Sequence, residues 1–182
     1  MLVEFRLHGR GGQGVVIGAE LLAKAAFLEG RWSQASPFFG AERRGAPVKA
    51  YTRISDREIF LRSQVYEPDF VVVFDQTLLG IEVWSGLKPE GMLIINTERP
   101  PGDLGLDFRV ATVDATGIAL RLGLLTAGLP IVNTAMLGAL ARASEVVSID
   151  SVMKAIVEEW PRRAGEVNVT AAKAAYESTL TS

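Results

Sequence analysis

The sequence predicts an α/β fold, Rossmann-like, with a mostly parallel sheet, helices on both faces and a helical C-terminal region. Three observations lead to this expectation. An alternation of apolar and polar residues at positions 2–7 runs into the glycine cluster at 9–14, and a helical pattern follows directly. Apolar runs then alternate with helical segments, as in sheets whose parallel strands are joined by helices. Beyond residue 133 only helical patterns remain.

The expected strands are short alternating or apolar runs, and they cover residues 2–7, 47–54, 58–61, 69–75, 91–96 and 108–113. The second and third would form a hairpin across Ser55 and Asp56. The run at 69–75 is continuously apolar between two acids, which is typical of a strand buried on both faces.

The expected helices cover residues 15–28, 77–87, 116–125, 134–143, 151–160 and 170–179. Gly30 is the expected stop of the first helix. Ser148 or Asp150 is the expected cap of the helix at 151–160.

Length and composition favour one compact domain over residues 1–182. The chain is 48% hydrophobic and 22% charged, which excludes a disordered tail or a charged linker. Pro100, Pro101 and Gly102 mark a loop in this domain and not a linker. There is no cysteine, so this chain provides no disulfide, thiolate nucleophile or cysteine-held metal or cluster. His8 is the only histidine, which argues against a His-rich metal site or a Ser–His–Asp triad.

Two features of the sequence bear on the cellular compartment and on membrane insertion. Glu4 and Arg6 interrupt the N-terminal stretch that a signal peptide would keep apolar, so we expect a cytoplasmic protein. Residues 122–141 carry no charge and match the length of a membrane span, but Pro130 would break a helix there. We therefore expect two short buried segments joined at 128–130 and no membrane helix.

The net charge of −2 argues against a general nucleic-acid binder. Residues 31–62 nevertheless hold seven basic and three acidic residues inside an otherwise acidic chain. Such a stretch suits a small anionic ligand or an acidic partner surface. Scattered, solvated arginines are the alternative.

Gly9, Gly11 and Gly14 satisfy G-x-G-x-x-G between an expected strand and an expected helix. Glycines there bring backbone N–H groups close to a phosphate at the positive end of the helix. A tight turn without a ligand is the alternative. Residues 32–37 lack the acid that binds ribose in dinucleotide-binding domains, which disfavours an NAD-dependent dehydrogenase. The Lys-Ser/Thr pair of a P-loop NTPase is also missing.

Three motifs occur in order along the chain: His8-Gly-Arg-Gly-Gly-Gln-Gly14, then Phe39-Gly-Ala-Glu-Arg-Arg-Gly-Ala-Pro47 followed by Ala50-Tyr-Thr-Arg-Ile54, and Asn133-Thr-Ala-Met-Leu-Gly-Ala-Leu140. Together they resemble the gamma subunit of 2-oxoacid:ferredoxin oxidoreductases of the pyruvate and 2-oxoisovalerate types, from about Leu2 to Tyr176. A free-standing nucleotide- or flavin-binding module and the related subunit of an indolepyruvate-type enzyme are the other candidates.

The resemblance implies an enzyme that converts a 2-oxoacid and coenzyme A to acyl-CoA and carbon dioxide and reduces ferredoxin. Thiamine diphosphate would be held by the alpha and beta subunits, and iron–sulfur clusters by the beta and delta subunits. The gamma subunit would carry neither, with no catalytic residue and no metal ligand of its own. It would pack on the alpha subunit and help to enclose coenzyme A.

The candidate coenzyme A contacts are the glycine cluster and two downstream arginines: Gly9, Arg10, Gly11, Gly12, Gln13, Gly14, Arg43 and Arg44. Arg43 and Arg44 could instead pair with acids of the alpha subunit. Glu42 could form a local ion pair with either arginine.

Four further residues have structural interpretations beside functional ones. Asn133 is expected as a helix cap, with an interface role as the alternative. Asp75 follows a buried strand, where open α/β sheets bind ligands, but an acid that anchors a loop is the other reading. We expect His8 to pack or hydrogen-bond locally beside the glycine turn, with contact to a ligand as the alternative. Trp160, like the other tryptophans, is expected in the core or an interface.

Overall fold

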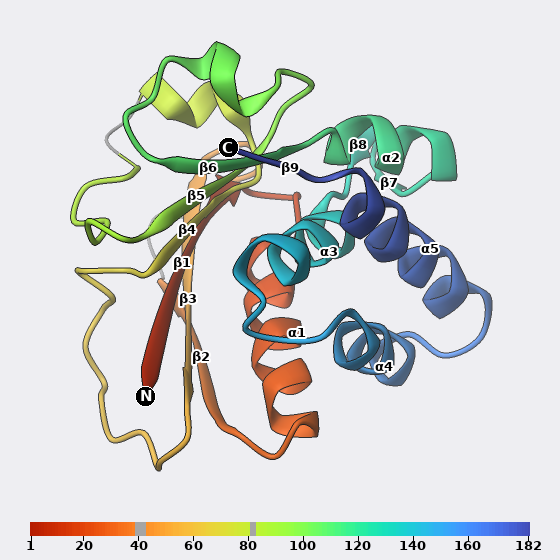
Figure 1. Ribbon diagram of the computed structural model, residues 1–182. Coiled ribbons are helices and arrows are strands. Elements are labelled where there is room, and N and C mark those ends of the chain that lie inside the picture. The colour runs from red at the N-terminus through yellow and green to blue at the C-terminus, as the bar shows by residue number, and fades with distance from the viewer. Residues whose placement is uncertain (39–42, 81–82) are drawn as a thin grey trace.

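The computed structural model describes residues 1–38, 43–80 and 83–182. Over these residues the main sheet has seven strands in the order β2-β3-β1-β4-β5-β6-β9. Their bounds are β1 Leu2–Arg10, β2 Trp32–Phe38, β3 Pro47–Ser55, β4 Phe70–Val73, β5 Met92–Asn96, β6 Arg109–Val113 and β9 Leu180–Thr181. β1, β4, β5 and β6 are mutually parallel, whereas β3 and β9 run antiparallel to their neighbours (Figure 1). The expected α/β fold with a mostly parallel sheet is confirmed.

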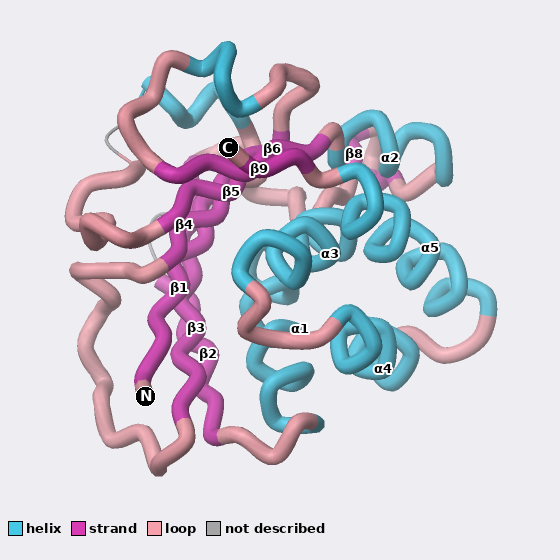
Figure 2. The backbone as a smooth tube through the Cα atoms, viewed as in Figure 1, coloured by secondary structure: helices cyan, strands magenta, loops and turns pink. Residues whose placement is uncertain are grey.

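The α-helices gather on one face of the sheet, as Figures 1 and 2 show. They are α1 Val15–Leu28, α2 Ala115–Leu122, α3 Asn133–Ser144, α4 Ile149–Glu159 and α5 Arg163–Ser178. The opposite face is covered by the 3-10 helices η1 Gln76–Gly80 and η2 Pro101–Leu104 and by connecting segments. Helices therefore lie on both faces, but those on the second face are short and of the 3-10 type.

The two faces of the sheet belong to two apolar clusters. On β4, Val72 packs into the large cluster beneath the α-helices, while Val71 and Val73 pack into the smaller cluster beneath η1 and η2. All three side chains are fully buried. The expectation of a strand buried on both faces is thus confirmed for this segment.

Two expected elements are wrong. Residues 58–61 form no strand, because the edge of β3 is taken by β2, which the sequence analysis missed. Ser36 pairs with Tyr51 in this register, so the strand conformation of β2 depends on a partner elsewhere in the chain. The helix expected at 77–87 is also not found over the described part of that range, where η1 ends at Gly80 and residues 83–86 form a turn. The carboxylate of Asp75 accepts hydrogen bonds from both the N–H and the hydroxyl of Thr77, and this local turn starts the 3-10 helix.

Other helix boundaries follow the expectations more closely. The expected bounds of α1 are confirmed, and Ser148 caps α4 by accepting a hydrogen bond from Ser151 N–H at 3.1 Å. Asn133 is not a cap: it is the first residue of α3, after Val132. α5 begins earlier than expected and ends near the expected residue.

The uncharged stretch at 122–141 consists of two segments that are joined at 128–130, as expected. There β7 Leu125–Thr126 and β8 Leu129–Pro130 form a small hairpin. Leu125 and Leu129 are exposed, so the expectation of burial is wrong for this half and right for α3. Among the described residues, no helix combines the length and apolar character needed to cross a membrane.

Candidate functional site

The glycine loop, residues 9–14, connects β1 to α1 and is joined by hydrogen bonds to the arginine loop, residues 43–46. Gly11 N–H donates to the Ala46 carbonyl at 2.9 Å, and Gly45 N–H donates to the Gly11 carbonyl at 3.2 Å. A Cβ atom on Gly11 would lie 2.7 Å from the carbonyl oxygen of Arg43. The close approach of the two loops therefore requires glycine at position 11.

Gly14 brings the third sequence motif to the same place. It precedes α1 with a φ of 82°, in the left-handed region that favours glycine. A Cβ atom on Gly14 would lie 2.5 Å from Nδ2 of Asn133, the first residue of α3. The glycine loop, the arginine loop and the start of α3 are thus brought together by direct contact.

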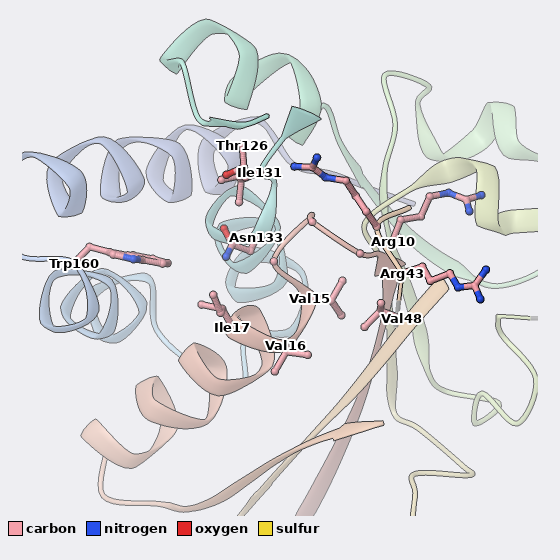
Figure 3. A pocket seen from close by; sticks show the side chains of 14 residues that line it. Arg10, Val15, Val16, Ile17, Arg43, Val48, Thr126, Ile131, Asn133 and Trp160 are labelled. Atoms are coloured by element: carbon pink, nitrogen blue, oxygen red, sulfur yellow. The ribbon is translucent and has the colours of Figure 1, made fainter. Parts of the chain in front are cut away.

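A cleft of about 650 Å³ opens where these segments meet. In Figure 3, Val15, Val16 and Ile17 of α1 lie along one wall, with Trp160 at one end and Arg10 and Arg43 at the other. The complete lining consists of Arg10, Gly11, Gly12, Gly14, Val15, Val16, Ile17, Arg43, Arg44, Val48, Thr126, Ile131, Asn133 and Trp160.

The N-terminus of α1 faces this cleft through its first residues. Within the described part of the chain, no side chain caps the helix, and its first turn holds no acidic residue. Unpaired N–H groups and the helix dipole give this end a partial positive charge. The cleft is therefore electrostatically suited to an anionic group.

Arg10 lines the cleft but is fixed by neighbours. Its Nε lies 3.3 Å from an Asp75 carboxylate oxygen, and its Nη1 donates to the Gly45 carbonyl at 3.2 Å. Gln13 completes the network: its Oε1 accepts from Arg10 N–H at 2.7 Å, and its Nε2 donates to Asp75 at 3.1 Å. Asp75 therefore anchors both the glycine loop and, through Arg10, the arginine loop.

The carboxylate of Asp75 stays charged in this network. Partial burial would raise its pKa, but hydrogen bonds from Thr77 and Gln13 and the charge of Arg10 hold the pKa below its usual value. Of the two interpretations of Asp75, the structure shows the loop anchor.

The predicted contact residues divide into two groups. Arg10, Gly11, Gly12, Gly14, Arg43 and Arg44 line the cleft. Gly9 instead packs between Val15 and Phe74, and Gln13 is used internally. The Arg43 and Arg44 side chains are exposed and make no ion pair with any residue the structure describes. Glu42, the expected local partner, lies outside the described residues. The binding role of all eight residues stays a prediction.

Eight lining residues were not among the contacts expected from the sequence: Val15, Val16, Ile17, Val48, Thr126, Ile131, Asn133 and Trp160. Thr126 and Ile131 reach the cleft through the β7–β8 hairpin, and Trp160 does so from the end of α4. Gly128 and Pro130 predicted a turn at 128–130, but the sequence did not predict that this turn would lie beside the cleft. Nothing in the sequence near Trp160 signalled the cleft. Among the described residues, no group of three His, Asp or Glu side chains gathers to hold a metal ion.

Fold and site define a Rossmann-like chain in which a glycine loop and an arginine loop frame one cleft. The family model for pyruvate ferredoxin/flavodoxin oxidoreductase matches residues 4–178. The pyruvate synthase subunit PorC of Methanocaldococcus jannaschii is 53% identical over 180 residues, 98% of each chain. The common gamma subunit of the pyruvate/ketoisovalerate oxidoreductases of Pyrococcus furiosus is 50% identical over 184 residues, 98% of this chain and 97% of that one.

The crystal structure of the pyruvate oxidoreductase subunit PORC of Thermotoga maritima superposes with a TM-score of 0.87 at 36% identity, covering 100% of this chain and 98% of that one. The chain therefore belongs to the pyruvate ferredoxin/flavodoxin oxidoreductase family. It is a gamma-type subunit of a 2-oxoacid:ferredoxin oxidoreductase complex, as the resemblance of its three motifs predicted.

Proposed function

We propose that the cleft binds the phosphates of coenzyme A while the chain is assembled on the alpha subunit of its enzyme. The observation that carries this proposal is the convergence of the uncapped start of α1 with Arg43 and Arg44 at a single cleft. Backbone N–H groups at a helix start and guanidinium groups are both well suited to bind phosphate.

The size and shape of the cleft fit part of this ligand. Its volume of about 650 Å³ lies within the range of small-molecule sites, and no atom lies within 4 Å of where a Cβ of Gly12 would be, so the loop leaves open space at that position. Val15, Ile131 and Trp160 add an apolar surface beside the charged end. Such a mixture suits a ligand with a charged diphosphate and less polar neighbouring groups.

The other chemistry of the reaction belongs to partner subunits in this proposal. Iron–sulfur clusters are held by cysteine thiolates, and this chain contains none. Thiamine diphosphate supplies carbanion stabilisation for the decarboxylation. The alpha, beta and delta subunits would hold these groups and pass electrons to ferredoxin in the cytoplasm, while the gamma chain retains and orients coenzyme A.

Arg43→Ala and Arg44→Ala test the proposal in the assembled enzyme. We expect each to raise the KM for coenzyme A about tenfold with little change in kcat, because a charge-assisted contact to a phosphate is lost. Arg57→Ala is the matched control, since Arg57 is exposed and lies outside the cleft. An unchanged KM together with loss of assembly would instead assign these arginines to the alpha-subunit interface.

Purification of the native complex tests the partner assignment separately. Alpha, beta and delta chains should copurify with this one in fixed proportion. Recovery of the chain by itself, yellow or loaded with a nucleotide, would contradict the assignment and favour a free-standing binding module.

A further inference from the structure

A second cavity lies on the sheet face opposite the α-helices. On β1, Leu7 packs beneath the α-helices, whereas Arg6 and His8 point to the other face with Lys49 and Tyr51 of β3. Together with Gln64 and Tyr66 they line a cavity of about 220 Å³. We propose that this cavity, hereafter the Lys49 pocket, binds a small oxyanion of the size of phosphate or a simple carboxylate.

The charge of the Lys49 pocket carries the proposal. Arg6 and Lys49 contribute two positive charges, and neither forms an ion pair with a residue that the structure describes. The nearby Glu4 carboxylate is paired with Arg53 Nε at 2.7 Å, so that pair neutralises itself. A pocket with two cations and no acid of its own favours an anionic occupant.

Arg6 supplies its charge from a buried and fixed position. Only 8% of the residue is exposed, and its guanidinium donates to neutral acceptors: His8 Nε2 at 3.0 Å, the Val83 carbonyl at 2.8 Å, and the carbonyls of Val65 and Ser85. Such contacts hold the guanidinium in place but leave its charge uncompensated. The field of Arg6 inside the pocket is therefore preorganised.

The His8 imidazole adds a hydrogen-bond donor whose protonation state and tautomer are defined. Its Nε2 accepts the hydrogen bond from Arg6, so the neutral ring carries its proton on Nδ1. Burial and the charges of Arg6 and Lys49 lower the pKa of His8 to about 3, which keeps the ring neutral near pH 7. A bound anion would offset these charges and raise that pKa.

Access and size narrow the class of ligand. Lys49 is exposed and Tyr66 is 68% exposed, so the mouth of the pocket opens to solvent. Its volume lies below the range of sites for nucleotides and similar ligands. A small oxyanion fits this volume and can enter from solvent, where it would contact the Lys49 ammonium group and a neutral hydrogen-bond donor.

His8 provides a direct probe because it is the only histidine of the chain. We would titrate inorganic phosphate, and separately acetate, into the full chain at low ionic strength and follow the imidazole Cε1–H NMR signal of His8. Saturable movement of the signal in the millimolar range is expected. Lys49→Gln should weaken binding about tenfold or more, because a charge-assisted contact is lost.

Lys154→Gln is the matched control, since Lys154 is exposed on α4, outside the pocket. This variant should bind phosphate as the wild type does. An unmoved His8 signal, or equal movement in the wild type and Lys49→Gln, would overturn the proposal. A thermal-shift measurement, taken as the difference between the wild type and Lys49→Gln, gives a second readout that cancels the general effect of phosphate on stability.

Discussion

Gly14 packs directly against the side chain of Asn133, so that no Cβ atom fits at position 14 without displacing the amide. The contact joins the start of α1 to the start of α3, two segments far apart in the sequence. Asn133 is itself almost fully buried, at 1% exposure, and its Oδ1 accepts from Thr134 N–H at 2.8 Å. The pair therefore couples the glycine loop to the helical C-terminal region.

Gly14→Ala should lower the free energy of unfolding by about 3 kcal/mol, because the left-handed φ and the clash with Asn133 add together. Urea denaturation measures the change. Gly12→Ala is the control: its φ is 95°, but nothing lies within 4 Å of its Cβ position, so about 1 kcal/mol is expected.

Asn133→Ala, combined with Gly14→Ala, forms a double-mutant cycle. Truncation of the amide removes the nearest clashing atoms, so the double variant should lose less stability than the two single losses combined. Additive losses would show that the contact between the two residues does not limit position 14.

Asp75→Asn should loosen the glycine loop, because an amide group cannot accept from both Gln13 and Arg10 while it keeps both contacts to Thr77. We expect the free energy of unfolding, measured by urea denaturation at neutral pH, to fall by about 1–2 kcal/mol. Asp107→Asn, at an exposed position, should change stability by less than about 0.5 kcal/mol.

The loss in Asp75→Asn should also depend on pH in a defined direction. The folded pKa of Asp75 lies below its usual value, so the stabilisation is present above the unfolded pKa and disappears as the pH falls through the folded pKa. A difference between variant and wild type that persists undiminished in strong acid would contradict the role of the carboxylate charge.

Gly138→Ala tests the packing of α3 on α5. A Cβ atom at Gly138 would lie 1.9 Å from the carbonyl oxygen of Ala172, so the two helices would have to separate. We expect a loss of about 3 kcal/mol or more in the free energy of unfolding, despite the better helix propensity of alanine. Gly102→Ala, where nothing lies within 4 Å, should be nearly neutral in the same assay.

His8 should make the folded chain sensitive to mild acid. Because its folded pKa is lowered to about 3, the unfolded chain takes up a proton near pH 6.5 that the folded chain does not. Stability should therefore fall by about 2 kcal/mol between pH 6.5 and pH 5. The pKa of the Asp75 carboxylate lies below its usual value, so Asp75 titrates below this pH window.

His8→Gln removes the titrating ring while its amide oxygen can still accept from Arg6. Denaturation curves at a series of pH values should show a flatter slope for this variant between pH 6.5 and pH 5. Parallel slopes for the variant and the wild type would show that His8 titrates normally in the folded chain.

Those parts of the fold that depend on local signals were predicted well. The buried strands β4 and β5 are continuous apolar runs, and α1 begins directly after its glycine motif, so their boundaries follow from a few adjacent residues. β2 was missed because Ser33, Ser36 and Pro37 carry no strand signal, and its conformation depends on pairing with β3.

The candidate site divides in the same way. The glycine loop and the arginine loop were expected from the sequence, and both line the cleft. Trp160 was not expected there, since only the packing of α4 against α1 brings it near the glycine loop. The tie between Arg10 and Asp75 is equally non-local, because it depends on the parallel pairing of β1 with β4.

The sequence by itself determined the α/β class, the family and the order of the motifs, because each of these depends on residue types within short stretches. The tertiary structure alone decided that α-helices cover one face of the sheet, that Gly14 meets Asn133, and that Arg6, His8 and Lys49 share a pocket. Contacts of this kind are set by strand register and helix packing, which bring distant segments together only when the whole chain buries its apolar surface.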